Sequence, residues 1–159
     1  MSKKEVKTNA MRMLDRQKIP YEYEEYECDE FTDGIQVADK LGYDHSLVYK
    51  TLVTTGKTGQ HYVFVIPIEE EIDFKKAAKV VGEKSLEMLH LKDLTKVTGY
   101  VRGGCTAIGM KKQFPVFIDE TAILFDTFCL SGGKIGVTLE LNAEALSAAI
   151  GAKFADLTL

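Results

Sequence analysis

Two pairs of β-strands joined by tight turns most strongly limit the folds open to this chain. Residues 48–54 and 61–68 are apolar runs separated by TGKTG, and residues 124–130 and 135–141 flank the glycine-rich segment SGGKIG. Such patterns are typical of β-hairpins, in which the two strands are antiparallel. A purely parallel sheet is therefore excluded.

Helices are predicted between and around these strands, from apolar spacing and from residues that begin or end a helix. They cover residues 6–17 (stopped by Pro20), 35–41, 74–81 (Asp73 to Gly82), a turn from Asp93, and 143–150 (Asn142 to Gly151). Further strands are expected at 21–27 (an edge strand), 86–89 and 114–118, and a strand or tail at 152–159. We therefore expect a single compact α+β domain over residues 1–159, with a mixed, largely antiparallel, barrel-like sheet and flanking helices.

The composition excludes several classes of protein. No apolar run approaches the roughly 20 residues that cross a bilayer, and the N-terminus lacks the apolar segment of a secretory signal, so we expect a cytoplasmic protein. The three cysteines (Cys28, Cys105, Cys129) are odd in number and widely spaced, which favours reduced thiols. They show no ligand spacing with the three histidines (His45, His61, His90), so we expect no metal site and no cofactor.

Charge is unevenly distributed over a chain whose net charge is −4. Residues 21–33 contain acidic residues and no basic ones, whereas in residues 71–112 lysine and arginine outnumber the acids. The basic excess indicates either a locally basic face or lysines that merely solvate helices. If the lysines form a stripe (Lys75, Lys76, Lys79, Lys111, Lys112), binding to a nucleic acid should be sensitive to salt.

Lys50 is the most unusual residue of the strand predicted within residues 46–53, SLVYKTLV. Because side chains alternate between the two faces of a strand, Val48, Lys50 and Leu52 should share one side. An ammonium group on this apolar stripe has two interpretations. Either it reaches water from the edge of a sheet, or it lies at the mouth of a pocket that takes an anion.

The loop at residues 99–112, GYVRGGCTAIGMKK, is rich in glycine and ends in two lysines. Adjacent glycines allow backbone N–H groups to approach the oxygen atoms of a ligand, although a long flexible turn has the same composition. Cys105 next to these glycines is a candidate nucleophile, but activation needs a base or a cation that favours the thiolate. No histidine is close in sequence, so a small apolar filler is the better interpretation.

Three segments, in this order, resemble the YbaK/EbsC family, relatives of the editing domain of bacterial prolyl-tRNA synthetases. They are VYKTLV at 48–53, the loop at 99–112, and SGGKIGVTLEL at 131–141, followed by a helix and AKFAD at 152–156. The resemblance covers nearly the whole chain. It implies a free-standing aminoacyl-tRNA deacylase that removes cysteine from mischarged Cys-tRNA(Pro), can also act on Cys-tRNA(Cys), and needs no cofactor. The implied partners are the 3′ acceptor end of the aminoacylated tRNA and, as a candidate, prolyl-tRNA synthetase.

The resemblance also implies the site residues. Lys50 matches the functional lysine of the family, which we expect to bind phosphate at the 3′ end, and Tyr26 aligns with a pocket tyrosine. Gly103 and Gly104 match the glycine loop around the acylated 3′ end. The remaining expected substrate-binding residues are threonines (Thr51, Thr106, Thr138).

Two departures from the family pattern affect the expected specificity. Family loops commonly read G-G-x-S-P, where this chain has Thr106 and Ala107, and an aspartate often stands at the position of Thr138. Two alternatives to cysteine editing therefore remain. One is a deacylase for another small aminoacyl-tRNA, such as Ala-tRNA(Pro), and the other is a non-catalytic protein that binds tRNA or a synthetase.

Overall fold

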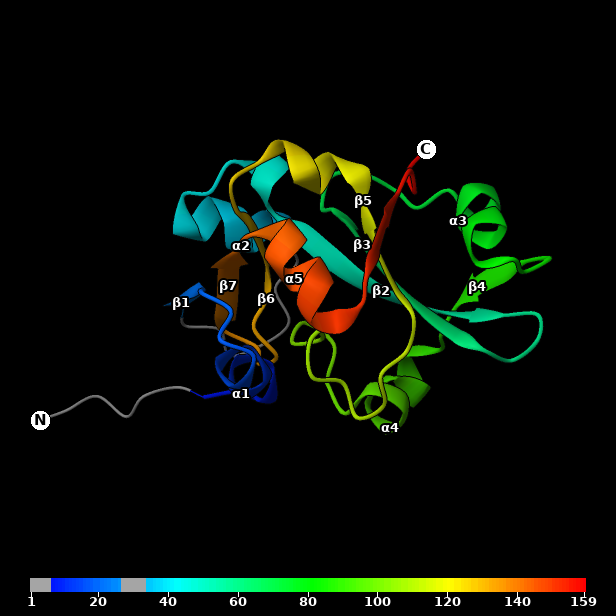
Figure 1. Ribbon diagram of the computed structural model, residues 1–159, viewed down its shortest axis with the longest axis horizontal. Coiled ribbons are helices and arrows are strands. Elements are labelled where there is room, and N and C mark those ends of the chain that lie inside the picture. Colours follow the sequence, from blue (N-terminus) through cyan, green and yellow to red (C-terminus); the bar gives the residue numbers. More distant parts are fainter. Residues whose placement is uncertain (1–6, 27–33) are drawn as a thin grey trace, which may run out of the picture.

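Two β-sheets form the centre of the fold (Figure 1). The structure, a computed structural model, describes residues 7–26 and 34–159. In this part of the chain one sheet has the strand order β4-β2-β3-β5-β8 and the other the order β1-β7-β6. The strands are β1 (Glu22–Glu25), β2 (Tyr49–Gly56), β3 (His61–Pro67), β4 (Leu86–Met88), β5 (Val116–Asp119), β6 (Phe128–Ser131), β7 (Val137–Leu141) and β8 (Lys153–Ala155).

The strand pairing confirms the predicted α+β class. β5 is parallel to both β3 and β8, while the other strand pairs are antiparallel, so the arrangement is mixed and largely antiparallel. The two predicted hairpins are present as β2–β3 and β6–β7, and β1 is an edge strand beside β7. The described strands form two open sheets rather than a closed barrel.

Short helices cover the sheets. They are α1 (Asn9–Arg16), α2 (Gly34–Leu41), α3 (Phe74–Val81), α4 (Leu94–Thr98) and α5 (Ala143–Ile150), with 3-10 turns η1 (His45–Leu47), η2 (Leu91–Asp93) and η3 (Glu120–Leu124). No helix among the described residues is both long and apolar enough to cross a membrane.

The residues predicted to begin and end helices do so in most cases. The side chain of Asp73 accepts hydrogen bonds from two backbone N–H groups of α3, and Asn142 accepts one from Ala145 in α5. Gly82 and Gly151 end these helices in the left-handed conformation. Asp93 differs, because its side chain makes no capping hydrogen bond to α4.

One predicted strand begins later than expected. The pattern predicts a strand over residues 124–130, but β6 starts at Phe128 and η3 occupies residues 120–124. Asp119 explains the difference, because its carboxylate accepts hydrogen bonds from the backbone N–H and the hydroxyl of Thr121 and so starts a helical turn. Pro115 lies at a strand end, directly before β5, as predicted.

The core occupies both faces of β3, which explains its uninterrupted apolar sequence. Val63 and Val65 pack in the larger cluster with residues of α1 and α5, including Leu14 and Leu146. Phe64 and Ile66 point to the opposite face, in a second cluster with residues of α3 and the C-terminal segment (Ala77, Ala78, Leu157). All four β3 side chains are completely buried.

The buried carboxylate of Asp119 connects three parts of the chain. One oxygen accepts from Thr121, and the other accepts from the backbone N–H of Leu157 at 3.1 Å. The Thr121 hydroxyl also bonds the hydroxyl of Tyr49 in β2 at 2.8 Å. The same residue therefore fixes η3, the C-terminal segment and, through Thr121, one end of β2.

We expect Asp119→Ala to lower the free energy of unfolding by about 2–4 kcal/mol, because it leaves buried donors without an acceptor. The measurement is urea unfolding followed by circular dichroism. Asp126→Ala, at an exposed aspartate in the loop before β6, is the control and should change stability by no more than about 0.5 kcal/mol. Equal stability of the two variants would contradict this role of Asp119.

Candidate functional site

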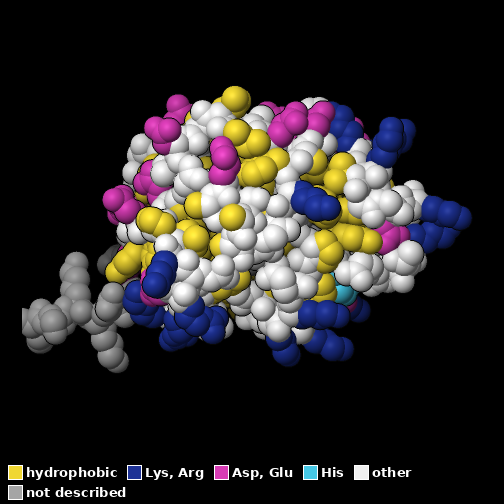
Figure 2. All heavy atoms as spheres, viewed as in Figure 1, with side chains coloured by type: hydrophobic (Ala, Val, Ile, Leu, Met, Phe, Trp, Pro, Cys, Tyr) yellow, Lys and Arg dark blue, Asp and Glu magenta, His cyan; other side chains and the backbone are white. Residues whose placement is uncertain are grey.

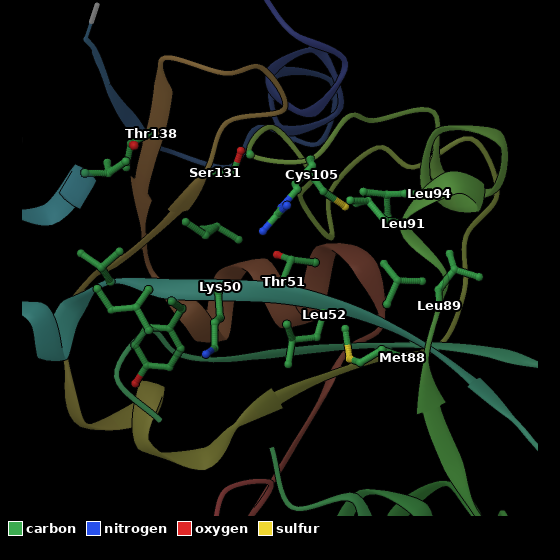
Figure 3. Close-up of a pocket in the computed structure, with 18 of the residues that line it drawn as sticks. Lys50, Thr51, Leu52, Met88, Leu89, Leu91, Leu94, Cys105, Ser131 and Thr138 are labelled. Atoms are coloured by element: carbon green, nitrogen blue, oxygen red, sulfur yellow. The ribbon is translucent and has the colours of Figure 1, made fainter. Parts of the chain in front are cut away.

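A cavity of about 600 Å³ lies where the two sheets separate (Figure 3). An isolated bridge between Val48 and Cys129 connects β2 with β6, and β4 pairs with β2 only at Thr54–Gly56. Between these points, the β2 edge at residues 49–52 has no strand partner in the part of the chain that the structure describes. The cavity lies against this uncovered edge.

One side of the cavity is apolar, and the rest of its lining is mixed. Apolar side chains from β2, β4, η2, α4 and the segment between β4 and η2 gather on one side in Figure 3 (Leu52, Met88, Leu89, Leu91, Leu94). Leu91 is 56% exposed, which places it at the rim. The rest of the lining combines polar residues (Tyr26, Lys50, Thr51, Arg102, Ser131, Thr138) with further apolar ones such as Val48 and Ile68. Apolar surroundings of this kind strengthen the interaction between a charged side chain and a bound anion.

Lys50 lies at the cavity. This position agrees with the interpretation that its ammonium group faces a pocket for an anion. Figure 3 shows that Lys50 and Leu52 leave β2 on one side and Thr51 on the other, which confirms the predicted alternation. The Lys50 side chain is partly buried, and its ammonium group has no hydrogen bond or ion pair with a residue that the structure describes. Its charge is therefore available to a ligand.

Gly103 and Gly104, the adjacent glycines of the loop at residues 99–112, have different positions relative to the cavity. Gly103 lines the cavity, whereas Gly104 does not. Gly104 packs against the β6–β7 hairpin, where an added Cβ would lie 3.0 Å from the Ile135 nitrogen. Its N–H donates to the Val101 carbonyl at 3.0 Å, so this N–H group is not free to approach a ligand oxygen. Gly104 instead holds the loop close to the hairpin.

Of the three threonines predicted to bind substrate, two line the cavity and one does not. Thr51 and Thr138 line the cavity together with Tyr26, but Thr106 is completely buried outside the cavity lining. The hydroxyls of Thr51 and Thr106 are buried and have no hydrogen-bond partner among the described residues. The Thr51 hydroxyl is thus a polar group at the cavity that a ligand can satisfy.

The described lining contains no carboxylate and no imidazole. Cys105 lines the cavity, but burial raises the pKa of its thiol to about 11, so it is protonated at neutral pH. This supports the apolar-filler interpretation. His45 lies elsewhere, between the carboxylates of Asp39 and Glu69. Among residues 7–26 and 34–159, no group of three potential ligands is placed to hold a metal ion.

Sequence reasoning missed Arg102, Ser131 and the apolar side as parts of the site. Arg102 directly precedes Gly103, so the glycine pair could have indicated it as a second cation at the cavity. Ser131 ends β6 beside the predicted hairpin turn, a similar signal. The leucines of β4, η2 and α4 give no comparable signal, because their apolar spacing is that of ordinary core residues.

Comparison with known proteins gives consistent matches over most of the chain. Residues 32–149 match the family of aminoacyl-tRNA editing domains. EbsC of Enterococcus faecalis, provisionally named a Cys-tRNA(Pro)/Cys-tRNA(Cys) deacylase, is 46% identical over 99% of this chain and 98% of its own length. YwhH of Bacillus subtilis, an uncharacterized protein, is 28% identical over 70% of this chain and 71% of its own length.

The fold agrees with these matches. A crystal structure provisionally named as a trans-editing enzyme for prolyl tRNA synthetase superposes with a TM-score of 0.82, at 23% identity, over 98% of this chain and 99% of its own. The family relationship predicted from the three ordered segments is therefore confirmed. By the extent of the family match and the identity to EbsC, this chain belongs to the aminoacyl-tRNA editing domain family.

Proposed function

We propose that this protein is a free-standing aminoacyl-tRNA deacylase that releases cysteine from mischarged Cys-tRNA(Pro) and also acts on Cys-tRNA(Cys). The observation that carries the proposal is Lys50, a cation without a described partner at a cavity in a chain of the editing family. The name given to EbsC, at 46% identity, supports cysteine as the amino acid. Prolyl-tRNA synthetase is proposed as the partner that supplies the mischarged tRNA.

Lys50 binds a phosphate of the tRNA 3′ end, for which an ammonium group serves as a compact point charge. Arg102 lines the same cavity and adds a second positive charge. The apolar side formed by residues such as Leu52 and Leu94 takes the less polar parts of the terminal nucleoside and excludes water. Tyr26, Thr51 and Thr138 supply hydroxyls to the polar parts of the same end.

The substrate's own thiol is the nucleophile in this proposal. Its sulfur attacks the ester carbonyl carbon, a C–S bond forms, and the C–O bond to the ribose breaks. The products are a cyclic cysteine thiolactone and the free ribose hydroxyl, which takes the proton that the thiol has lost. Holding thiol and carbonyl in contact can lower the barrier by roughly 7–11 kcal/mol, the gain of a well-oriented intramolecular reaction.

The cavity lining supports this route over attack by water. Water needs a general base, usually a histidine or a carboxylate, and the described lining has neither. Cys105 is no substitute, because its thiol is protonated at neutral pH. The protein contributes orientation and positive charge, and the substrate contributes the reactive group.

Thr138 supports one alternative substrate. It lines the cavity at the position where the family often has an aspartate, whereas Ala107 is buried away from the cavity lining. Of the two departures, only Thr138 therefore changes the group that faces a ligand. The alternative proposal is a deacylase for a different small aminoacyl-tRNA, such as Ala-tRNA(Pro), which needs attack by water.

Lys50→Ala should lower kcat/KM for deacylation of Cys-tRNA(Pro) by about 100- to 1,000-fold, the usual effect of removing one electrostatic contact to the reacting end. Lys57→Ala, which removes an exposed lysine from the β2–β3 turn, should leave kcat/KM unchanged. Both variants should keep the wild-type circular dichroism spectrum. Full activity of Lys50→Ala would remove Lys50 from the site.

Replacing the cysteinyl group by a seryl group should slow deacylation by at least about a hundredfold, because the hydroxyl is a far weaker nucleophile than the thiol. The assay compares Cys-tRNA(Pro), Ser-tRNA(Pro) and Ala-tRNA(Pro) at equal concentrations. Similar rates for all three would show attack by water and support the alternative. Binding of all three without release would indicate a non-catalytic protein.

Cys105→Ala should change kcat/KM for Cys-tRNA(Pro) by less than about threefold, because a protonated thiol of this kind takes no part in the reaction. Loss of a catalytic nucleophile typically costs more than about 10³-fold. Deacylation assays of the variant at pH 7 separate the two cases. A loss of that size would make Cys105 the nucleophile and contradict the substrate-assisted route.

A further inference from the structure

The basic residues that the sequence suggested as one stripe do not form one. Lys76 of α3 is bound to Asp156 at 2.9 Å and to the Thr158 carbonyl at 2.8 Å. In Figure 1, α3 also lies well apart from the loop that follows α4, which contains Lys111 and Lys112. The lysines of this loop lie near a different helix, α1.

A groove of about 730 Å³ lies between α1 and residues 109–113. Its polar lining consists mainly of guanidinium and amide side chains (Asn9, Arg12, Arg16, Gln17, Gln113). Lys111 and Lys112 are exposed beside it in the loop. We call this surface, defined by Arg12, Arg16, Gln17, Gln113, Lys111 and Lys112, the basic groove.

The basic groove keeps its positive charge free of described acidic partners. Arg12 bonds only the amide oxygen of Asn9, at 3.0 Å, and Arg16 has no ion pair with a described residue. The one acidic residue in the lining, Asp15, is bound by Lys7 at 2.7 Å. In Figure 2, Lys and Arg gather along the lower edge, over α1 and α4, where few acids are seen; other Lys and Arg lie at the right and upper right, and most acids lie along the upper edge.

Close packing links the loop at the cavity of the proposed active site to the β6–β7 hairpin, and the hairpin to the start of α1, the helix that lines the basic groove. Gly103 lines that cavity, and its neighbour Gly104 packs so closely on the β6–β7 hairpin that an added Cβ would lie 3.2 Å from the Lys134 Cα. In the same hairpin, a Cβ on Gly133 would lie 3.5 Å from the Cβ of Thr8, the residue that begins α1. The exposed Lys134 thus lies between the cavity loop and α1.

We propose that the basic groove binds the sugar–phosphate backbone of the tRNA acceptor stem while the 3′ end occupies the cavity, an inference that rests on the proposed function. Proteins recognise double-stranded RNA mainly through phosphate and 2′-hydroxyl contacts, to which guanidinium and amide groups are suited. Protein interfaces instead centre on apolar and aromatic anchors, and the two apolar side chains in the described lining, Met13 and Met110, are partly or fully buried. An RNA duplex therefore fits the groove better than an acidic protein.

The first test measures binding of an acceptor-stem RNA minihelix that carries no amino acid and has a single-stranded CCA end. Binding is followed by fluorescence anisotropy over a range of salt concentrations. Arg12→Gln/Arg16→Gln removes two phosphate contacts, so the slope of log affinity against log salt should become shallower by about 1.4–1.8. At 0.1 M salt the affinity should fall about 25- to 60-fold, which is two contacts with a slope of roughly 0.7–0.9 each. Unchanged affinity and slope would overturn the proposal.

The matched control is Lys75→Gln/Lys79→Gln, which removes the same charge from exposed positions of α3 and should leave the minihelix affinity and slope unchanged. Equal losses in both double variants would show that only net charge matters and would also overturn the proposal. If the Arg12/Arg16 variant lost binding to the synthetase but kept binding to RNA, the groove would be a site for a protein partner. This result would also overturn the proposal.

A second test separates this inference from the proposed function. In Arg12→Gln/Arg16→Gln, kcat/KM for a cysteinyl minihelix should fall at least about tenfold, while kcat/KM for a cysteinylated CCA trinucleotide, which has no stem, should stay at the wild-type value. Equal losses on both substrates would overturn the stem-binding role. If the wild-type protein deacylates neither substrate, the proposed function fails. The anisotropy measurement would still show whether the basic groove binds the acceptor stem.

Discussion

The uncovered edge of β2 between the two sheets is the feature on which the cavity depends. β2 is held on one side by β3 along its whole length, but on the other side it has described partners only near its ends, at Val48 and Thr54–Gly56. A fully paired edge would fill the space that Lys50 and Thr51 now line. The hairpin β6–β7, the loop at residues 99–112 and the leucines after β4 then close the cavity from different directions (Figure 3).

The chemistry of the lining follows from this architecture. Lys50 is placed among apolar side chains without a described carboxylate to neutralise it, so an anion is the ligand that best satisfies it. The same lining lacks a described base, and burial keeps the Cys105 thiol protonated. This composition supports the proposal that the site orients a substrate that brings its own nucleophile.

Local patterns in the sequence were sufficient for most of the secondary structure and for part of the site. Asp73, Asn142, Gly82 and Gly151 act within a few residues of their own position, so their roles could be predicted. Gly104 and the apolar side of the cavity depend on contacts between distant segments. The closeness of Gly104 to Lys134, and the hydrogen bond from Leu157 to Asp119, cannot be derived from neighbouring residues.

We propose that the protein orients a cysteinyl ester whose own thiol breaks the linkage. The most direct measurement is the mass of the first product in a rapidly quenched single turnover of Cys-tRNA(Pro). With the substrate's thiol as nucleophile, a cyclic thiolactone, lighter than cysteine by one water, should appear before any free cysteine. Free cysteine as the first product, with no thiolactone at the earliest times, would contradict it and indicate attack by water.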